Sequence, residues 1–270
     1  MSNIWNKYFD KIYCIRWTGK GLLDLNDDSY PLISELRRIG ILNSGIFEMT
    51  YSTNMPSNIV YYERMNGFEF PEHRLNERYI HVTMTHYEVI KKSYELGYKR
   101  ILILEDDILF LNDLNRIYDM ISNIPQEPGI ILYDYIELDN IGDENDLFHK
   151  YNIKSEYYHN LYSGLLSSCY SLNRDGMQYM IWCVENGPIY DIDKYFSYYD
   201  VYYTNCHNGK YEAKAQVPLM ACSNINMAIQ TYDYKKIYNE AYDDKFFTSH
   251  VNIEDYNIKL LNMQNCNTKL

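Results

Sequence analysis

The sequence has little positive charge. Its 270 residues carry 25 lysines and arginines against 37 aspartates and glutamates, which is a formal net charge of −12. Proteins that bind DNA or RNA need a basic surface to offset the repulsion of the phosphates, so this balance argues against a nucleic-acid partner. It does not argue against a small phosphorylated ligand, because one bound cation reverses the charge around it.

Paired cysteines, a signal sequence and long apolar runs are also missing. The six cysteines are scattered, with no Cys-x-x-Cys pair and no grouping with histidine at zinc-finger spacing, which is typical of thiols in a reducing compartment. The first eleven residues have no apolar signal core, and no apolar run approaches the about 18 residues of a membrane span. We therefore expect a cytoplasmic protein, and peripheral contact with the inner face of a membrane stays open.

Repeats and low-complexity linkers are absent as well. Hydrophobic residues make up 46% of the chain, which is enough to bury a core. A chain of this length suits one large α/β domain, and no change of composition marks a boundary within it. We expect a single domain over residues 1–270.

Apolar residues recur with spacings that alternate between strand and helix. Strands are expected over residues 10–16, 45–51, 129–133 and 168–172, in a stretch that starts at residue 100 and ends in acids, and in a late edge strand over 215–220. Helices are expected over residues 31–39, 85–96, 114–124 and 174–184. This order is typical of parallel crossovers, so it predicts the α/β class, a Rossmann-like mixed sheet flanked by helices.

Capping signals mark several helix ends. Thr85, with Glu88 three residues on, matches a capping box and predicts that a helix begins there. Asp113 and Asn173 are placed to cap the helices that follow them. Gly97 is a stop signal at the end of the second helix.

The most informative stretch holds three consecutive acids between two apolar runs. Residues 101–104 are apolar without alternation, as in a strand buried on both faces, and they lead into Glu105, Asp106 and Asp107. Ligands of α/β sheets bind where such strands end. Three carboxylates in that crevice repel each other unless a proton or a cation intervenes, and we take a divalent metal as the simplest cation. In an extended backbone, Glu105 and Asp107 point to one side and Asp106 to the other.

These landmarks and four others stand in a characteristic order. They are Ile12-Tyr13-Cys14-Ile15, Thr85-His86, Ile103-Leu104-Glu105-Asp106-Asp107-Ile108, Ile130-Ile131-Leu132, Cys169 to Gly176, and Pro188 with Asp191 and Asp193. In this order they resemble glycosyltransferase family 25, the lipopolysaccharide-type glycosyltransferases related to the collagen galactosyltransferases. The resemblance covers residues 10–230. Thr85 stands where the family usually has serine, and the region 190–208 matches poorly.

The resemblance implies a GT-A-like fold, a nucleotide-sugar donor, a divalent cation and inversion at the anomeric carbon. Many members use UDP-galactose. Residues 1–135 would then form the nucleotide-sugar-binding half, residues 136–250 the half that binds a glycan acceptor, and residues 251–270 a C-terminal tail. The product would be a surface glycan, such as lipopolysaccharide or capsule, built on an oligosaccharide or lipid-linked acceptor.

Site residues follow from this resemblance together with the chemistry of the acids. Mn²⁺ or Mg²⁺ suits hard oxygen ligands and a diphosphate, and we assign Asp107 as its direct ligand. Glu105 would face the ribose or a metal-bound water, and Asp106 would serve either site. Arg16 would meet the nucleotide or lie in solvent. His86 would contact the donor or belong to the core.

Inversion needs a general base that accepts the proton of the acceptor hydroxyl. The resemblance places an acid after the Gly187-Pro188 turn, so Asp193 is the first choice and Asp191 the second. His207 and His250 are weaker candidates for a late metal ligand.

Two other functions fit parts of the pattern. A metal-dependent phosphohydrolase or nucleotidyltransferase also places acids at strand ends, but it would need further acids or a basic phosphate clamp at neighbouring strands. A catalytically inactive protein that binds sugar nucleotides is the other alternative, and the intact run of three acids counts against it.

Overall fold

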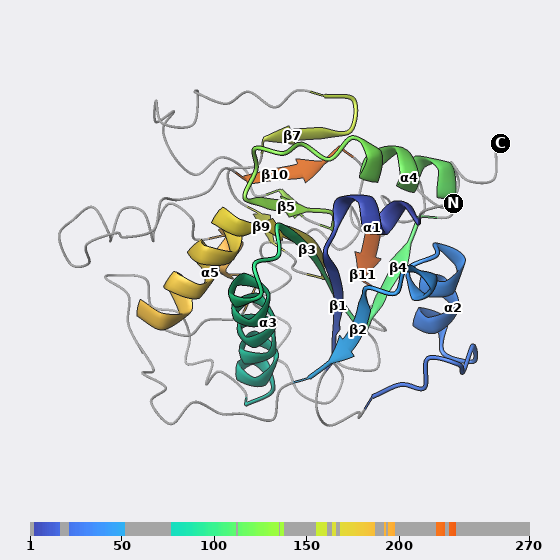
Figure 1. Ribbon diagram of the computed structural model, residues 1–270, viewed down its shortest axis with the longest axis horizontal. Helices are drawn as coiled ribbons and strands as arrows, with labels where there is room; N and C mark the ends of the chain where they lie inside the picture. Colours follow the sequence, from blue (N-terminus) through green and yellow to red (C-terminus); the bar gives the residue numbers. More distant parts are fainter. Residues whose placement is uncertain are drawn as a thin grey trace, which may run out of the picture.

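The computed structural model describes residues 3–16, 22–51, 77–111, 113–134, 136–137, 155–160, 164–165, 168–186, 192, 194–197, 220–224 and 227–230. In this part of the chain a central sheet is covered by helices on both faces (Figure 1). The expected α/β class, a mixed sheet flanked by helices, is confirmed. The late region 252–270 lies outside the described residues.

The main sheet has seven strands in the order β2-β1-β3-β9-β5-β10-β7. Their bounds are β1 Lys11–Ile15, β2 Phe47–Thr50, β3 Arg100–Glu105, β5 Ile130–Leu132, β7 Tyr158–Asn160, β9 Cys169–Asn173 and β10 Met220–Ser223. β1 is parallel to β2 and β3, whereas β9 runs antiparallel between β3 and β5. β10 is parallel to β5, so the carboxyl ends of β1, β2, β3, β5 and β10 share one edge of the sheet.

Two short sheets lie beside the main one. They pair β4 Ile108–Phe110 with β11 Ala228–Gln230, and β6 Ile136–Glu137 with β8 Gly164–Leu165. Of the late edge strand predicted over 215–220, residues 215–219 lie outside the described residues. Met220 begins β10, which lies between β5 and β7, so the prediction of an edge position is wrong. β7, which precedes it in sequence, pairs antiparallel with its outer side and is the last strand of the described sheet.

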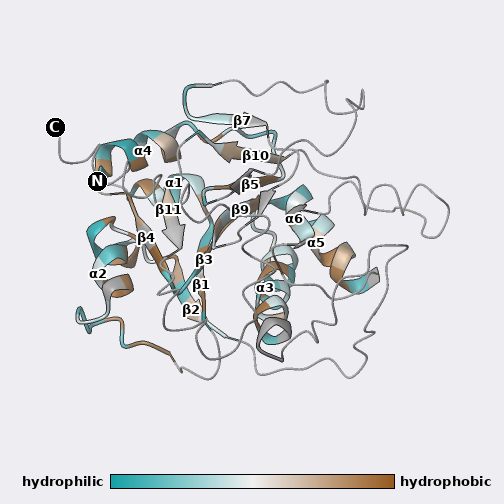
Figure 2. Ribbon diagram, turned by 180° about the vertical axis from the view of Figure 1, so that it is seen from behind, coloured by the Kyte–Doolittle hydropathy of each residue, from teal (hydrophilic) through white to brown (hydrophobic). Residues whose placement is uncertain are grey.

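Helices cover the two faces of the sheet in two groups (Figure 1). On one face lie α1 Ile4–Tyr8, α2 Pro31–Arg38 and α4 Leu114–Ser122, with the 3-10 turn Leu42–Ser44 nearby. On the other face lie α3 Glu77–Glu95, α5 Arg174–Asn186 and the short α6 Lys194–Ser197. The strands between them are predominantly apolar, as the brown ribbons of Figure 2 show. Apolar side chains on both faces are what a strand without alternation requires.

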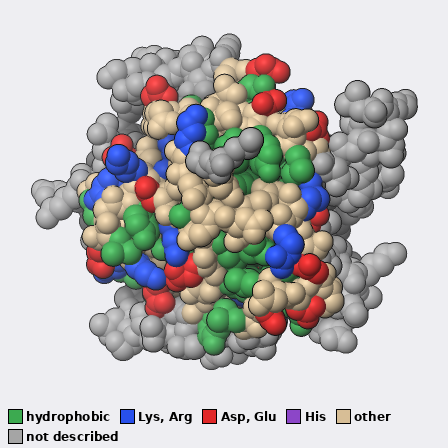
Figure 3. All heavy atoms as spheres, turned by 45° about the vertical axis from the view of Figure 1, so that its right-hand side comes forward, with side chains coloured by type: hydrophobic (Ala, Val, Ile, Leu, Met, Phe, Trp, Pro, Cys, Tyr) green, Lys and Arg blue, Asp and Glu red, His purple; other side chains and the backbone are tan. Residues whose placement is uncertain are grey.

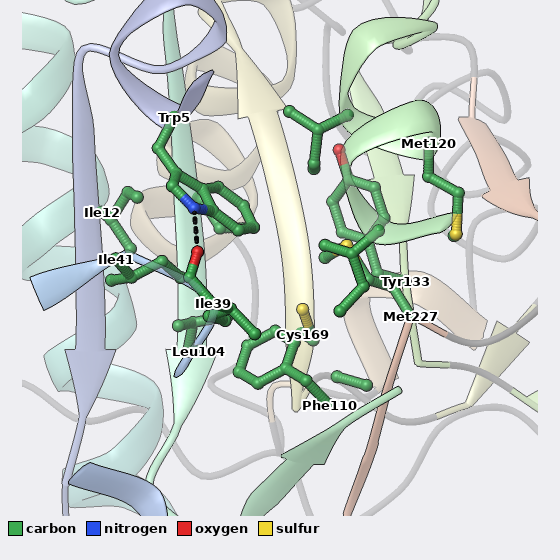
Figure 4. Packing of buried hydrophobic residues seen from close by; sticks show 14 of the residues in the cluster. Trp5, Ile12, Ile39, Ile41, Leu104, Phe110, Met120, Tyr133, Cys169 and Met227 are labelled. Carbon is green, nitrogen blue, oxygen red and sulfur yellow. Dashed lines mark hydrogen bonds between the residues drawn. The ribbon is translucent and has the colours of Figure 1, made fainter. Parts of the chain in front are cut away.

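The first core fills the space between the sheet and α1, α2 and α4. Trp5 is fully buried there, and its indole Nε1 donates a hydrogen bond of 2.8 Å to the carbonyl of Ile39 (Figure 4). Tyr133, just after β5, and Cys169, at the start of β9, approach the same space (Figure 4). The bond of Trp5 joins the start of the chain to the end of α2, so the N-terminal turn is part of this core.

The second core lies between the sheet and α3 and α5. It contains Ile103, Tyr170 and Leu132 from three neighbouring strands, which face each other in register. Because side chains alternate along a strand, residues two positions further on point to this same face. Two positions further on, this face therefore carries the polar residues Glu105, Ser168 and Asp134 at the carboxyl edge.

The start of α3 differs from the capping-box prediction. The helix begins at Glu77, and Thr85 lies in its interior, where its hydroxyl donates a hydrogen bond of 2.7 Å to the carbonyl of His81. Inside a helix, a threonine hydroxyl can donate to the carbonyl four residues earlier, as here. The sequence pattern alone therefore did not distinguish a helix cap from a position in the helix interior. The predicted end is correct, because Gly97 has φ of 78° just after the last turn.

The other cap predictions are confirmed. The Asp113 side chain accepts a hydrogen bond of 3.1 Å from the amide of Arg116 at the start of α4. Asn173 Oδ1 accepts bonds from the amides of Asp175 and Gly176 at the start of α5.

Replacing the α4 cap tests how much this end contributes. Asp113→Ala is expected to lower the free energy of unfolding by about 1 kcal/mol, because an amide of the first turn loses its acceptor. Urea unfolding followed by circular dichroism measures the loss. Asp113→Asn retains a side-chain oxygen acceptor and should retain most of the stability; equal losses in both variants would contradict the capping role.

Candidate functional site

The three acids lie at a turn between two sheets. β3 ends at Glu105, Asp106 and Asp107 form the turn, and β4 begins at Ile108 in the small sheet with β11. The expectation that Glu105 and Asp107 share one side of an extended backbone therefore fails, because the backbone is not extended through residues 106–107. Below, Asp106 and Asp107 are called the acidic turn. It lies at the carboxyl edge beside the end of β1.

Arg16 reaches the acidic turn from the end of β1. The register pairs Ile15 with Glu105, and the amide of Arg16 donates to the carbonyl of Thr50 at the end of β2. Arg16 Nη1 lies 3.3 Å from Asp106 Oδ2, and both side chains are about nine-tenths buried, with 10% and 13% exposed. Arg16 Nε is buried without a hydrogen-bond partner. A cation of the protein itself thus offsets part of the repulsion among the acids.

His86 lies on α3 above the end of β3 and is fully buried. Its Nδ1 is 2.7 Å from the hydroxyl oxygen of Tyr170, and its ring stacks on the Tyr170 ring at 5.7 Å between centroids. Its Nε2 is 3.6 Å from Glu105 Oε1, which is within ion-pair range but longer than a hydrogen bond. Oxygen Oε1 of the Glu105 carboxylate therefore faces the buried imidazole of His86.

The three acids also act electrostatically on Cys14, near the end of β1. Burial raises the pKa of the Cys14 thiol well above its ordinary value, and Asp106, Asp107 and Glu105 raise it further while Arg16 lowers it. The three carboxylates therefore act on one buried atom from nearby. An anionic ligand would need more positive charge than Arg16 supplies to approach this edge.

Carboxylate oxygen atoms are the donors that this edge would offer to a cation. The described residues contain no group of three or more histidines, cysteines, aspartates or glutamates that could hold a metal. Mg²⁺ and ions like it are commonly bound by one or two carboxylates, with water and substrate phosphates completing the coordination, so such a group is not required. Asp107 and Glu105 supply hard oxygen atoms for this arrangement, and Asp106 is engaged by Arg16.

Asp134 is a further acid at this edge that sequence analysis missed. It lies two residues past the end of β5, is fully buried, and accepts a hydrogen bond from the hydroxyl of Ser168. The carbonyl of Ser168 in turn accepts a bond of 2.8 Å from the amide of Glu105. The signal was present, since Asp134 follows an apolar strand as Glu105 does, but a lone acid is less conspicuous than three.

Asp191 and Asp193, the predicted bases, lie outside the described residues, as do His207 and His250. Ile192, between the two aspartates in sequence, is described and is buried in the second core together with Tyr170. Its carbonyl accepts a hydrogen bond of 3.1 Å from the amide of Tyr195 at the start of α6.

A surface pocket of about 310 Å³ lies elsewhere on the molecule. It is lined by Leu25, Asn26, Arg37, Leu42, Asn43, Gly45 and Phe47. Phe47 begins β2, so this pocket lies toward the amino end of that strand, away from the acidic turn. Arg37 is already engaged there by Asp28 and by the carbonyl of Leu25. We therefore place the candidate site at the carboxyl edge.

Two other features of the described residues concern the length of the helices and the distribution of charge on the surface. No helix in the described ranges combines the length and apolarity needed to cross a bilayer. On the face drawn in Figure 3, lysines and arginines are interspersed with aspartates and glutamates among the described residues.

Comparisons with known proteins provide only distant similarities. No family model matches the chain, so the resemblance to glycosyltransferase family 25 has no further support, and no curated protein matches it. Among solved structures, A197 from STIV is similar with 11% identity over 83% of this chain and 86% of that chain, at a TM-score of 0.38.

Two further structures are similar at the same low level. A glycosyltransferase involved in glycosylation of the major capsid of PBCV-1 has 11% identity, covers 65% of this chain and 68% of its own, and gives a TM-score of 0.30. A mannose-1-phosphate geranyltransferase from Thermus thermophilus has 6% identity, covers 81% and 74%, and gives a TM-score of 0.36. Similarities of this size support no conclusion about activity.

Proposed function

We propose that this protein is a glycosyltransferase that binds a nucleotide sugar at the acidic turn. The observation that carries the proposal is the position of Asp106 and Asp107 at the carboxyl end of β3, with Arg16 of the neighbouring strand 3.3 Å from Asp106. Ligands of α/β sheets bind at this edge. An edge that combines two acids with a buried arginine suits a diphosphate and a cation together, since each neutralises charge that the other adds.

The diphosphate end of the donor is proposed to lie between Arg16 and Asp107. The guanidinium of Arg16 is oriented by Asp106, and a phosphate oxygen would approach the part of the Arg16 side chain, 10%, that stays exposed. Asp107 and Glu105 would hold Mn²⁺ or Mg²⁺, which when bound offsets the charge that develops on the departing nucleotide diphosphate. With Glu105 Oε1 facing His86, its contact with the ribose or a metal-bound water would be made by Oε2.

The acceptor side of the reaction is proposed to use Asp193, with Asp191 as the second choice. A carboxylate near the acceptor hydroxyl accepts its proton as the oxygen attacks the anomeric carbon, and attack opposite the departing diphosphate inverts that carbon. The burial of Ile192 in the second core, to which Tyr170 also belongs, supports this proposal, because it holds the residue between the two aspartates on the face of the sheet that also carries His86. A UDP-sugar, with galactose first, and a glycan acceptor remain the proposed substrates.

A nucleotidyltransferase or phosphohydrolase is the second candidate, and Asp134 is the observation that favours it. Such an enzyme would have acids at several strand ends, and Asp134 follows β5 as Glu105 ends β3. Asp134 is fully buried and bonded to Ser168, however, whereas a metal or phosphate would have to reach its carboxylate. The glycosyltransferase proposal therefore comes first.

One experiment separates these functions. The purified protein is incubated with a panel of UDP-, GDP- and CDP-sugars and with nucleoside triphosphates, each with Mn²⁺ or with EDTA, and the products are followed by mass spectrometry. Release of a nucleoside diphosphate with the sugar moved to water or a glycan supports the proposal. Release of pyrophosphate or phosphate supports the second candidate, and nucleotide binding in calorimetry with no turnover of any donor indicates a binding protein.

Arg16→Ala is expected to weaken nucleotide binding by about 10- to 100-fold, because a charge-assisted hydrogen bond to phosphate is lost. Calorimetry with UDP and Mn²⁺ measures the dissociation constant. Arg16→Lys should restore only part of the affinity, since an ammonium group cannot contact Asp106 and a phosphate with two parallel donors. Wild-type affinity in both variants would remove Arg16 from the site.

A further inference from the structure

Three polar residues form a row across three neighbouring strands at the carboxyl edge. Ile103, Tyr170 and Leu132 face each other in register across β3, β9 and β5. Two residues further along, the same register places Glu105, Ser168 and Asp134 opposite one another. Two hydrogen bonds bear this out, because the Glu105 amide donates to the Ser168 carbonyl and the Ser168 hydroxyl donates to Asp134.

Ser168 joins the two ends of this row through different atoms. Its carbonyl bonds the last residue of β3, and its hydroxyl bonds the acid beyond β5. The amides of Tyr133 and Asp134 also bond the carbonyl of Cys169, at 2.9 and 3.3 Å. The start of β9 is therefore held from both sides, next to the residue that precedes the acidic turn.

The carboxylate of Asp134 is fully buried in this row. Burial raises the pKa of the Cys169 thiol, and the Asp134 carboxylate raises it further, which places the two groups close together. Removing a carboxylate from water is costly unless hydrogen bonds compensate, and Ser168 provides one such bond. Apolar residues in place of Ser168 and Asp134 would be enough for packing. An acid at position 134 therefore indicates that its hydrogen bond is needed to position Ser168.

We propose that Asp134 is a positioning residue for the acidic turn. It orients the Ser168 hydroxyl, the same residue's carbonyl holds the Glu105 amide, and Glu105 is the residue from which Asp106 and Asp107 turn away. The inference rests on the proposed function in one respect, which is that the turn binds the nucleotide diphosphate. Asp134 acts through Ser168 and does not touch the donor.

Two measurements on Asp134→Ala test this role. The first is hydrogen exchange of the Glu105 amide, followed by NMR or by mass spectrometry with site resolution, and it is expected to speed up by about tenfold or more as the bond to Ser168 loosens. The second is the dissociation constant of UDP with Mn²⁺, which is expected to rise by about 10- to 100-fold, the range typical for residues that orient a ligand group. Asp134→Asn retains an acceptor for the Ser168 hydroxyl and should recover most of both effects.

Asp10→Ala is the matched control. Asp10 Oδ2 accepts bonds of 2.6 and 3.1 Å from the amides of Lys99 and Arg100, at the opposite end of the same strand. Its loss should weaken β3 without selectively exposing the Glu105 amide. Unchanged exchange at Glu105 in Asp134→Ala relative to this control would overturn the inference, and so would wild-type UDP affinity in a variant that has lost the protection.

Two further outcomes keep the tests apart. If Asp134→Ala does not fold, Ser168→Ala removes the same bond from the other side with a smaller change of volume, and the same expectations and refutations apply to it. If the wild-type protein binds no nucleotide, the proposed function fails and the binding part of this inference fails with it. Exchange at Glu105 then still decides whether Asp134 holds the end of β3.

Discussion

Asp107→Ala is expected to reduce sugar transfer by about 100- to 1,000-fold, the loss typical when one group that stabilises developing charge is removed. Asp107 is the residue proposed as the direct ligand of the cation, with Glu105 as the second acid beside it. Asp106 is paired with Arg16. The measurement is the initial rate of donor turnover with saturating Mn²⁺, together with UDP binding with Mn²⁺ and with EDTA. In the variant, the difference between Mn²⁺ and EDTA should largely disappear.

Asp175→Asn is the control for this prediction, since Asp175 is an exposed acid in the first turn of α5. It should retain the wild-type rate and the wild-type dependence on Mn²⁺. A rate in Asp107→Ala within a few-fold of wild type would show that the cation, if required, is held elsewhere. Loss of activity with full retention of Mn²⁺-dependent binding would instead assign Asp107 to the chemical step.

Gly176→Ala is expected to destabilise the fold by about 3 kcal/mol, near the upper end of the usual cost of overpacking. A Cβ built on Gly176 would lie 2.1 Å from the carbonyl oxygen of Gly129 and 2.7 Å from its carbonyl carbon. Alanine normally favours a helix over glycine by about 1 kcal/mol, so the sign of the effect reports on the clash. The new Cβ is attached directly to the backbone of α5, and the atoms it meets are the backbone of Gly129. Relief of the clash therefore requires α5 and the residue before β5 to separate.

Thermal unfolding measures this effect, and a loss of about 3 kcal/mol corresponds to a fall in the midpoint of about 6–12 °C for a domain of this size. Gly97→Ala is the matched control. Gly97 has φ of 78°, and a Cβ added there would meet no heavy atom within 4 Å, so only the backbone conformation is penalised, by about 1–2 kcal/mol. A midpoint for Gly176→Ala at or above that of Gly97→Ala would contradict the close approach.

Much of the fold was predictable because it depends on local patterns. The apolar run 101–104 became β3 with all four residues fully buried, as its lack of alternation indicated. Asp113 and Asn173 cap the helices that follow them, because a capping bond joins residues only two or three apart. The error at Thr85 has the same origin, since a hydroxyl inside a helix and one at its start have the same local sequence.

The candidate site was predictable only in part. Three acids after a buried strand pointed to the carboxyl edge, and the structure places them there. A divalent metal was expected as the simplest cation to offset their repulsion, and the structure adds protein groups to that picture, because Arg16 pairs with Asp106 and His86 faces Glu105. Each of these contacts joins residues that are far apart in the chain, and only a folded sheet brings them together.

The sequence by itself determined which segments are buried, because the spacing of hydrophobic residues is a local pattern. It also determined where a group of acids must contact water or a cation, because the three acids are adjacent in the chain. Tertiary structure alone decided how the acids are divided between partners. The parallel register of β1 and β3 puts Arg16 beside the turn. The antiparallel insertion of β9 between β3 and β5 brings Ser168 between Glu105 and Asp134. Register between distant strands is a property of the whole sheet, so no single segment encodes it.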